Sequence, residues 1–316
     1  MREALQAALS ELLGKRVEIT EPVLLAGGAS KEAWAVDADG QPLLVRRAAG
    51  GVIHRHTLSL ADELAVLEAA HEAGVAVPRP YGYLGEIDGR EAFAMERLAG
   101  ETIGRRIVGR EELAAARARL PVQLAEELAK IHAIPPERVP FLGEARLERM
   151  SDELDEVDEP HPAIELGLWW LRENRPPPRP LVVNHGDFRI GNVVVREEGL
   201  AGVLDWEFSH LDEPVRDLAF SLVRAWRFGI GEKRLGGIGD VEPYVERYNE
   251  LTGLDVRPEE LDYWELAGNV GWATGCLTQA RRHLTGRDRS VELAILGRLS
   301  AEVEYEICRL LEKVAV

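Results

Sequence analysis

The sequence predicts an α+β protein of two lobes, the first rich in β-strands and the second mostly helical. Residues 22–47 contain three short apolar runs separated by the turn-forming clusters GGAS and DADG, which is typical of antiparallel strands. Beyond residue 100, stretches such as 111–134 space their apolar residues as helices do. The chain has 316 residues, and a single hydrophobic core stops growing at roughly 250–300 residues. Two lobes around a sizeable core are therefore expected.

The first lobe is expected to hold two helices and five strands. Residues 2–13 and 59–73 place leucines at helical spacing, and a glycine follows each segment as a stop signal. After the turn VPRP, the segments YGYLGEIDG and EAFAMERL predict two more strands. The first lobe then covers residues 1–98, and the second covers residues 99–316.

The second lobe is expected to be mostly α-helical. Pro121 predicts a break within 111–134, because a new helix can start with proline in its first turn. The acidic run SDELDEVDEP is expected to be a solvated loop or helix end, or alternatively a recognition surface for a cationic substrate. PAIELGLWWLREN predicts a helix with Trp169 and Trp170 in the core. PPPRP must be extended, since proline fixes φ and disfavours helix before it.

Charge and cysteine content exclude several classes of protein. The formal net charge is -17, from 38 Lys plus Arg against 55 Asp plus Glu, and such a field repels nucleic acids and anionic membranes. Cys276 and Cys308 lie far apart, so neither a disulfide framework nor a zinc site is expected. No apolar run approaches the roughly 20 residues that span a bilayer, and the acidic start lacks signal-peptide features. We expect a soluble cytoplasmic protein with no nucleic-acid or membrane partner.

The segment HGDFRIGN, residues 185–192, is the strongest functional signal. LVVN before it predicts a strand, and VVVREEGLAGVLDW after it predicts a hairpin with a Glu-Glu-Gly turn. Asn192 precedes the first strand of this hairpin and Asp205 ends the second, so the hairpin brings them side by side. Asp187 lies on the preceding loop. Two carboxylates and one amide can therefore converge at one end of a small sheet.

These three side chains suit magnesium-assisted phosphoryl transfer. Mg²⁺ is typically held by one or two carboxylates plus substrate phosphates, which makes Asn192 and Asp205 candidate ligands. Asp187 could then accept a proton from a substrate hydroxyl. Alternatively, HGD is a turn whose aspartate caps a backbone N–H. The combined spacing favours catalysis, because it repeats that of a kinase catalytic loop and its metal-binding aspartate.

HGDFRIGN, LDWE and DEPVRDLAF together resemble the aminoglycoside phosphotransferase and choline kinase-like family, whose fold is similar to that of protein kinases. The resemblance covers nearly the whole chain and is most specific over residues 184–220. It implies Mg²⁺-dependent transfer of a phosphate from ATP or GTP to a hydroxyl of a small molecule. It also implies that Asp187 is the base and that Asn192 and Asp205 bind magnesium.

The same resemblance assigns supporting roles around this motif. Asp217 resembles a structural aspartate that hydrogen-bonds buried backbone, and His185 is expected to be a scaffold of the loop. Glu207 stands where protein kinases have the glycine of DFG. It is expected to be a metal or substrate neighbour, or else a surface glutamate.

The first lobe is expected to bind the nucleotide. The loop LLAGGASKEAW would cover the phosphates through Gly27, Gly28 and Ser30. Arg46, or else Arg47, stands where the family usually has lysine, and Glu63 would be its partner or else a solvated helix residue. An arginine here also resembles a subgroup met beside acyl-CoA metabolism. The segment FAMERLAG resembles the hinge between lobes, with the adenine-pocket positions Met95, Glu96 and Leu98.

The acceptor hydroxyl compound is expected to bind the helical lobe. The negative charge of the protein favours a cationic acceptor. Arg281, Arg282, His283 and Arg287 form a local basic patch that is expected to be a solvated helix face. If the patch lined the cleft, it would instead favour an anionic acceptor such as a hydroxyacyl-CoA. An alternative function is that of an inactive kinase-fold protein that binds nucleotide without turnover. Protein-kinase activity is disfavoured, because LDWEF runs directly into HLDEPVRDLAF without an activation loop.

Overall fold

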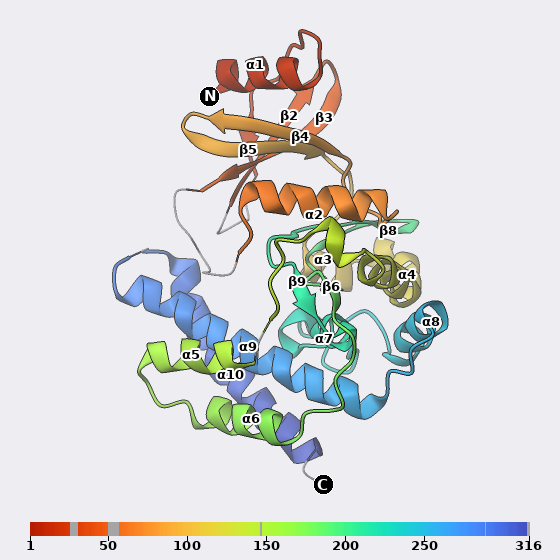
Figure 1. The fold of residues 1–316 in the computed structure, drawn as a ribbon, viewed down its shortest axis with the longest axis vertical. Helices are drawn as coiled ribbons and strands as arrows, with labels where there is room; N and C mark the ends of the chain where they lie inside the picture. Colours follow the sequence, from red (N-terminus) through yellow and green to blue (C-terminus); the bar gives the residue numbers. More distant parts are fainter. Residues whose placement is uncertain (26–30, 50–56, 146, 288, 315–316) are drawn as a thin grey trace.

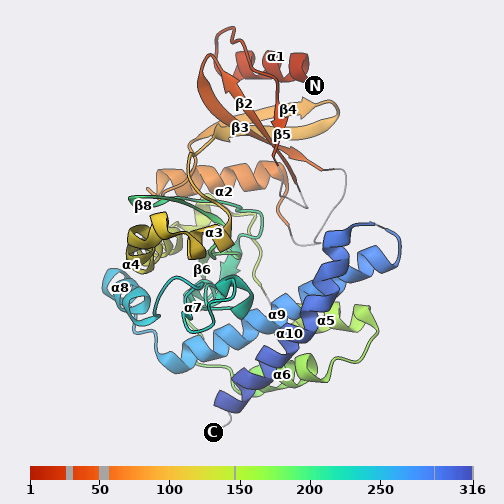
Figure 2. The same ribbon diagram turned by 180° about the vertical axis from the view of Figure 1, so that it is seen from behind.

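The computed structural model describes residues 1–25, 31–49, 57–145, 147–287 and 289–314. It consists of two lobes along its long axis, with a β-sheet lobe at one end and a helical lobe at the other (Figure 1, Figure 2). The predicted α+β fold of two lobes is confirmed. Gly27, Gly28 and Ser30 of the expected phosphate loop lie outside the described residues.

An antiparallel five-stranded sheet forms the first lobe, in the order β1-β2-β3-β5-β4. Its elements are α1 (Arg2–Leu12), β1 (Val23–Leu24), β2 (Lys31–Ala38), β3 (Gln41–Ala48), α2 (Leu60–Glu72), β4 (Pro80–Ile87) and β5 (Arg90–Glu96). Side chains of β5 alternate between the faces of the sheet. Ala92 and Ala94 belong to a core with α1, whereas Phe93 and Met95 belong to a core with α2. Helix α2 therefore lies between the sheet and the second lobe (Figure 1).

Helices and two small sheets build the second lobe. Its elements are α3 (Gly104–Gly109), η1 (Glu111–Leu113), α4 (Ala114–His132), η2 (Pro136–Arg138), α5 (Glu148–Val157), α6 (Pro162–Glu173), β6 (Val182–Asn184), β7 (Val193–Arg196), β8 (Gly199–Val203), β9 (His210–Asp212), α7 (Pro214–Phe220), η3 (Arg224–Arg227), α8 (Glu242–Thr252), α9 (Pro258–Leu284) and α10 (Val291–Val314). Strand β6 pairs with β9, and β7 pairs with β8. One apolar core runs from α2 and Phe93 into α4, α9 and α10, so the lobes share buried contacts.

Two local predictions about helices are wrong. Helix α4 continues through Pro121 without a break. A proline inside a helix costs about 3 kcal/mol, and burial of Leu120, Leu124 and Leu128 along the same face offsets this cost. Trp169 is 56% exposed rather than in the core, because α6 buries Ile164, Gly167, Leu168 and Leu171, and Trp169 lies off that face.

The acidic run after residue 150 is mostly helical. Helix α5 buries Leu154 and Val157 and leaves most of its acidic side chains outside the core. One acidic residue of this run, Glu153, lines the central cavity described below.

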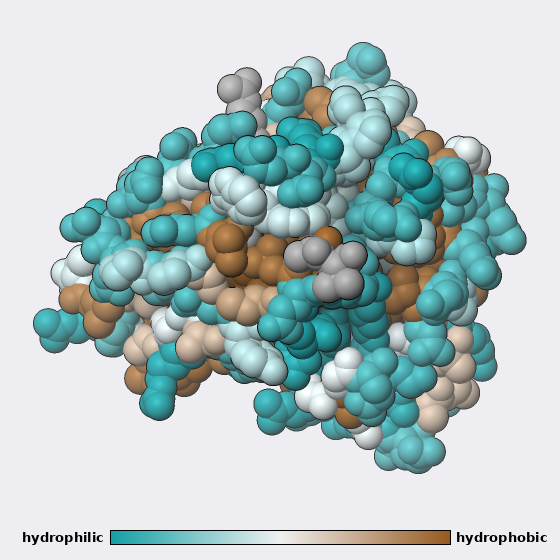
Figure 3. Space-filling view, turned by 90° about the horizontal axis from the view of Figure 1, so that it is seen from below, coloured by the Kyte–Doolittle hydropathy of each residue, from teal (hydrophilic) through white to brown (hydrophobic). Residues whose placement is uncertain are grey.

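The face of the molecule that is seen from below is mostly hydrophilic and carries several apolar patches, one of them near its centre (Figure 3). Among the described residues, no helix combines the length and apolar character needed to cross a bilayer.

Candidate active site

The β7–β8 hairpin places Asn192 and Asp205 at the same end, as the sequence predicts. Val193 pairs with Val203, and the backbone N–H of Leu204 donates to the carbonyl oxygen of Asn192 at 2.8 Å. The loop that carries Asp187 therefore meets the segment after the hairpin at one edge of the helical lobe.

Asp217 and His185 form the buried support of this loop. The Asp217 carboxylate accepts the backbone N–H groups of His185 at 2.6 Å and of Gly186 at 3.0 Å. His185 donates through Nε2 to the carbonyl of Leu204 at 2.9 Å, and burial lowers its pKa, which keeps the ring neutral. Gly186 has φ +82°, and a Cβ there would lie 2.2 Å from the Phe208 carbonyl oxygen, so only glycine fits.

Asp187 is fixed from three directions. Its backbone N–H donates to Nδ1 of His185 at 3.2 Å, Nε of Arg189 donates to Oδ1 at 2.9 Å, and Nδ2 of Asn192 donates to Oδ2 at 2.5 Å. Burial raises the pKa of Asp187, although the nearby Arg189 partly opposes this. The carboxylate thus accepts side-chain donors in a cavity, which differs from the alternative of a turn-capping aspartate.

Asp205 has an uncommon backbone conformation and lies beside a mostly buried cation. Its φ of +65° lies in the left-handed region, which a non-glycine residue seldom adopts. Oδ1 accepts Nη1 of Arg46 at 2.7 Å. Desolvation raises the pKa of Asp205, but the attraction of Arg46 outweighs it and the net shift is downward.

The side chains around Asp205 fit magnesium only if other molecules supply part of its coordination shell. Both hydrogen bonds recorded for the Asn192 side chain use Nδ2 and go to Asp187, so its Oδ1 keeps the capacity to bind a cation. Among the described residues, no group of three or more His, Cys, Asp or Glu residues could enclose a metal alone. One carboxylate plus one amide matches an ion whose remaining ligands come from phosphates and water.

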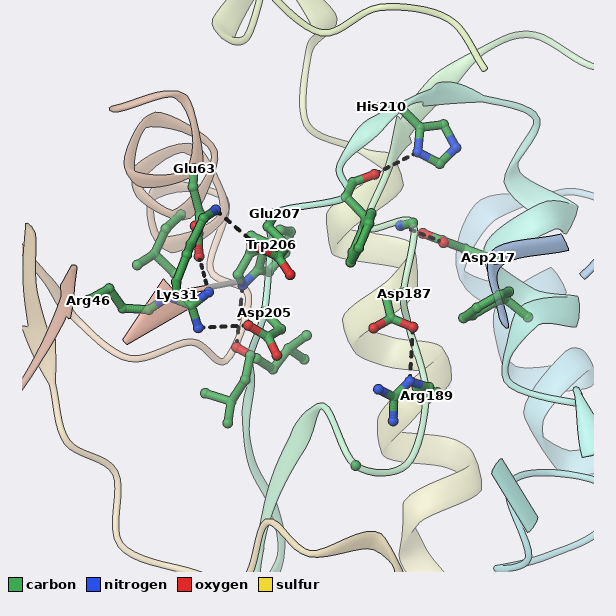
Figure 4. Close-up of a pocket in the computed structure, with 18 of the residues that line it drawn as sticks. Lys31, Arg46, Glu63, Asp187, Arg189, Asp205, Trp206, Glu207, His210 and Asp217 are labelled. Atoms are coloured by element: carbon green, nitrogen blue, oxygen red, sulfur yellow. Dashed lines mark hydrogen bonds and ion pairs between the residues drawn. The ribbon is translucent and has the colours of Figure 1, made fainter. Parts of the chain in front are cut away.

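The expected ion pair between Arg46 and Glu63 is present, at 3.1 Å between Nη2 and Oε1. Glu63 is 3% exposed, so the alternative of a solvated helix glutamate is wrong. Glu207 is also buried and is not a surface residue. A residue that the sequence did not indicate, Lys31 at the start of β2, contacts both carboxylates and completes a charged cluster beside Asp205 (Figure 4).

A cavity of about 770 Å³ joins these groups. One wall includes the predicted hinge positions Met95, Glu96 and Leu98, and residues of α5, α7 and α9 also line the cavity. The basic patch near the end of α9 contributes none of its four residues to the described cavity lining. The interpretation of the patch as an outer helix face is therefore favoured.

A family model described as the phosphotransferase enzyme family matches residues 22–251, which include the whole site. The chain belongs to the phosphotransferase enzyme family. Arg189, which contacts Asp187, is a second site residue that the sequence did not indicate. The Arg189 guanidinium lies 4.2 Å from the ring centre of Trp226, and this contact depends on tertiary packing.

Two relatives of the chain are described as acyl-CoA dehydrogenase family members. Acyl-CoA dehydrogenase family member 11 of Homo sapiens is 25% identical over 268 residues, which cover 76% of this chain and 34% of that protein. Acyl-CoA dehydrogenase family member 10 of Mus musculus is 29% identical over 150 residues, 44% of this chain and 14% of that protein. The chain thus spans about a third or less of these relatives.

Two solved structures show the same fold over almost the whole chain. A putative aminoglycoside phosphotransferase from Ralstonia eutropha has a TM-score of 0.76 at 20% identity, with 98% of each chain covered. A choline/ethanolamine kinase family protein from Mesorhizobium loti has a TM-score of 0.64 at 18% identity, with 94% of this chain and 90% of the other covered. The phosphotransferase fold is kinase-like, as predicted.

Proposed function

We propose that this protein transfers the γ-phosphate of a nucleoside triphosphate to a hydroxyl group of a small molecule. The observation that carries the proposal is the convergence of Asp187 and Asp205 on one cavity that Arg46 and Glu63 also line, with the Asn192 side chain hydrogen-bonded to Asp187. Family membership supports phosphoryl transfer as the reaction class. Solved relatives are described as complexes with GDP or with ADP, so ATP and GTP are both candidate donors.

The residues of the site suggest how the transfer proceeds. Asp187, with its raised pKa, takes the proton of the acceptor hydroxyl. The hydroxyl oxygen forms a bond to the γ-phosphorus as the bond to the β–γ bridging oxygen breaks, and the nucleoside diphosphate leaves. Asn192 and Asp205 would hold Mg²⁺ together with phosphate oxygens, and the bound ion would neutralise charge on the phosphates. Arg46 would provide a planar donor pair for the phosphates.

The helical wall of the cavity supports an acceptor with an apolar portion. Met150 of α5, Phe220 of α7, and Gly271 and Trp272 of α9 line this wall, and Leu296 of α10 extends it. A hydroxyl compound with an apolar chain would bury that chain here. The relation to proteins described as acyl-CoA dehydrogenase family members makes hydroxyacyl-CoAs one class to test.

The experiment is an assay of phosphate transfer with ATP and with GTP, each with Mg²⁺, against a panel of hydroxyl compounds. The panel comprises hydroxyacyl-CoAs, amino alcohols and aminoglycosides. We expect one class to be phosphorylated at a rate that exceeds nucleotide hydrolysis. Nucleotide binding without transfer to any class would instead support the alternative of a nucleotide-binding protein without turnover, for which Arg46 in place of lysine is the motivating feature.

A further inference from the structure

Five charged side chains form a ring that joins the two lobes (Figure 4). From Asp205 the ring runs to Arg46 at 2.7 Å, then to Glu63 at 3.1 Å, then to Lys31, and then to Glu207 at 3.3 Å. Glu207 lies two residues after Asp205, so the backbone closes the ring. Arg46, Glu63 and Lys31 belong to the first lobe, and Asp205 and Glu207 belong to the second. We call this arrangement the interlobe ring.

The two contacts between lobes in this ring differ in burial. The side chains of Lys31 and Glu207 are 8% and 9% exposed. Backbone bonds reinforce this contact, because Lys31 Nζ also donates to the Leu58 carbonyl at 3.3 Å, and the Leu58 N–H donates to the Glu207 carbonyl at 2.8 Å. The Asp205 side chain, in contrast, is 40% exposed, and its ion pair with Arg46 joins side chains alone. The first contact is therefore built to persist, and the second can exchange with a ligand.

The exchangeable contact joins the two groups that the nucleotide and the metal would use. While Nη1 of Arg46 donates one of its two N–H groups to Asp205, the guanidinium is held at that carboxylate and cannot present both Nη1 donors to a phosphate. A nucleotide that arrives without a cation must break this pair, and it leaves the Asp205 carboxylate beside phosphate charges. The ring already has three carboxylates against two cations, so the repulsion is uncompensated. A divalent cation on Asp205 would offset the loss of the Arg46–Asp205 ion pair, and it would also screen the repulsion between Asp205 and the phosphates.

We propose that the Arg46–Asp205 ion pair is a lock on the nucleotide site that Mg²⁺ opens, while Lys31 and Glu207 hold the lobes together. The inference rests on the proposed function only in taking Arg46 as the phosphate cation and Asp205 as the metal carboxylate. Arg46 leaves Asp205 for the phosphates, and Lys31 keeps Glu63 in place. Arg46 thus contacts the phosphates and Lys31 contacts Glu63, two contacts that a single lysine is expected to make elsewhere in the family. Mg²⁺ and nucleotide bind with positive coupling.

If the ion pair is such a lock, Asp205→Asn should strengthen nucleotide binding in the absence of Mg²⁺, although it removes a proposed metal ligand. Binding of a non-hydrolysable ATP or GTP analogue is measured by calorimetry in excess Mg²⁺ and in EDTA. In EDTA the variant should bind the analogue about five- to tenfold more tightly than the parent, because Arg46 no longer has to break an ion pair with residue 205. Added Mg²⁺ should then improve its affinity little. Asparagine tolerates the positive φ of this position, so the variant should fold; its thermal midpoint checks this.

Asp187→Asn is the matched control. It removes the same charge from the same cavity but leaves Arg46 paired, so its affinity in EDTA should change less than about twofold. Equal tightening in both variants would assign the effect to net charge and overturn the lock, as would an Asp205→Asn variant that binds no more tightly than the parent in EDTA. A parent that binds neither analogue even with Mg²⁺ would overturn the proposed function itself.

The persistent contact is tested by Lys31→Met, Glu207→Gln and the double variant. Each single change removes the same contact between two buried charged groups, so the double variant should lose less thermal stability than the sum of the two. Glu207→Gln should leave the Mg²⁺ concentration for half-maximal analogue binding unchanged. An increase in that concentration, as expected for loss of a metal ligand, would overturn the assignment of Glu207 to the interlobe contact.

Discussion

The raised pKa of Asp187 makes its carboxylate a stronger base. Burial raises its pKa above the ordinary 3.8, and Arg189 limits the rise. A base with a raised pKa has a higher affinity for the hydroxyl proton, and it stays ionised wherever the pH exceeds that raised value.

Asp187→Asn should reduce phosphate transfer by about 10²- to 10⁴-fold, because the proton acceptor is lost. The transfer rate of the parent should fall as pH falls through the raised pKa, above pH 3.8, and the residual rate of the variant should lack this limb. Folding raises this pKa, so protonation of Asp187 does not itself favour unfolding. Rates and circular dichroism measured over the same pH range separate the two effects. A variant with parental activity would remove Asp187 from catalysis.

Local spacing explains why some site residues were predictable and others were not. Asp187, Asn192 and Asp205 lie on one loop and one hairpin, so their convergence follows from a turn signal. Lys31 meets Glu63 of α2 and Glu207 of the second lobe through tertiary ion pairs between residues far apart in the sequence. No periodicity in the sequence encodes such contacts.

At the scale of elements, the sequence was most informative where turns and apolar periodicity agree. The β7–β8 hairpin and the strands β4 and β5 were predicted for this reason. The pairing of β5 with β3 was not, because strand order depends on contacts between distant segments. Helix α4 shows the opposite failure, since burial of its leucines overrides the local signal of Pro121.

We expect a substitution where α5 contacts α9 to weaken use of the acceptor without changing nucleotide affinity. A Cβ at Gly271 would lie 3.1 Å from Cε of Met150, at the helical wall of the cavity. Gly271→Leu should therefore lower kcat/KM for the acceptor roughly tenfold or more, with nucleotide affinity unchanged. Gly109→Leu in α3 is the control, because its Cβ would meet nothing within 4 Å. Equal loss of nucleotide affinity would argue against an acceptor wall here.

At the scale of the whole molecule, two lobes share one core and are also joined by the interlobe ring. The apolar core fixes α2 against the second lobe, and the ring then couples α2 to the segment after the hairpin. Composition predicted two lobes, but it could not predict that the ion pairs Arg46–Asp205 and Lys31–Glu207 would join them, because each of these two pairs combines residues that lie far apart in the sequence.

The net charge of -17 makes the ionic-strength dependence a test of the acceptor's charge. With nucleotide held at saturation, kcat/KM for a cationic acceptor should fall roughly tenfold between about 10 mM and about 200 mM NaCl, because salt screens the attractive field. An anionic acceptor should show the opposite trend, and a neutral polyol should show little change. The turnover number at saturating acceptor serves as the control, since long-range attraction acts on encounter and not on the chemistry. A cationic acceptor with no salt dependence would show that local contacts in the cavity, and not the field of the whole protein, decide its affinity.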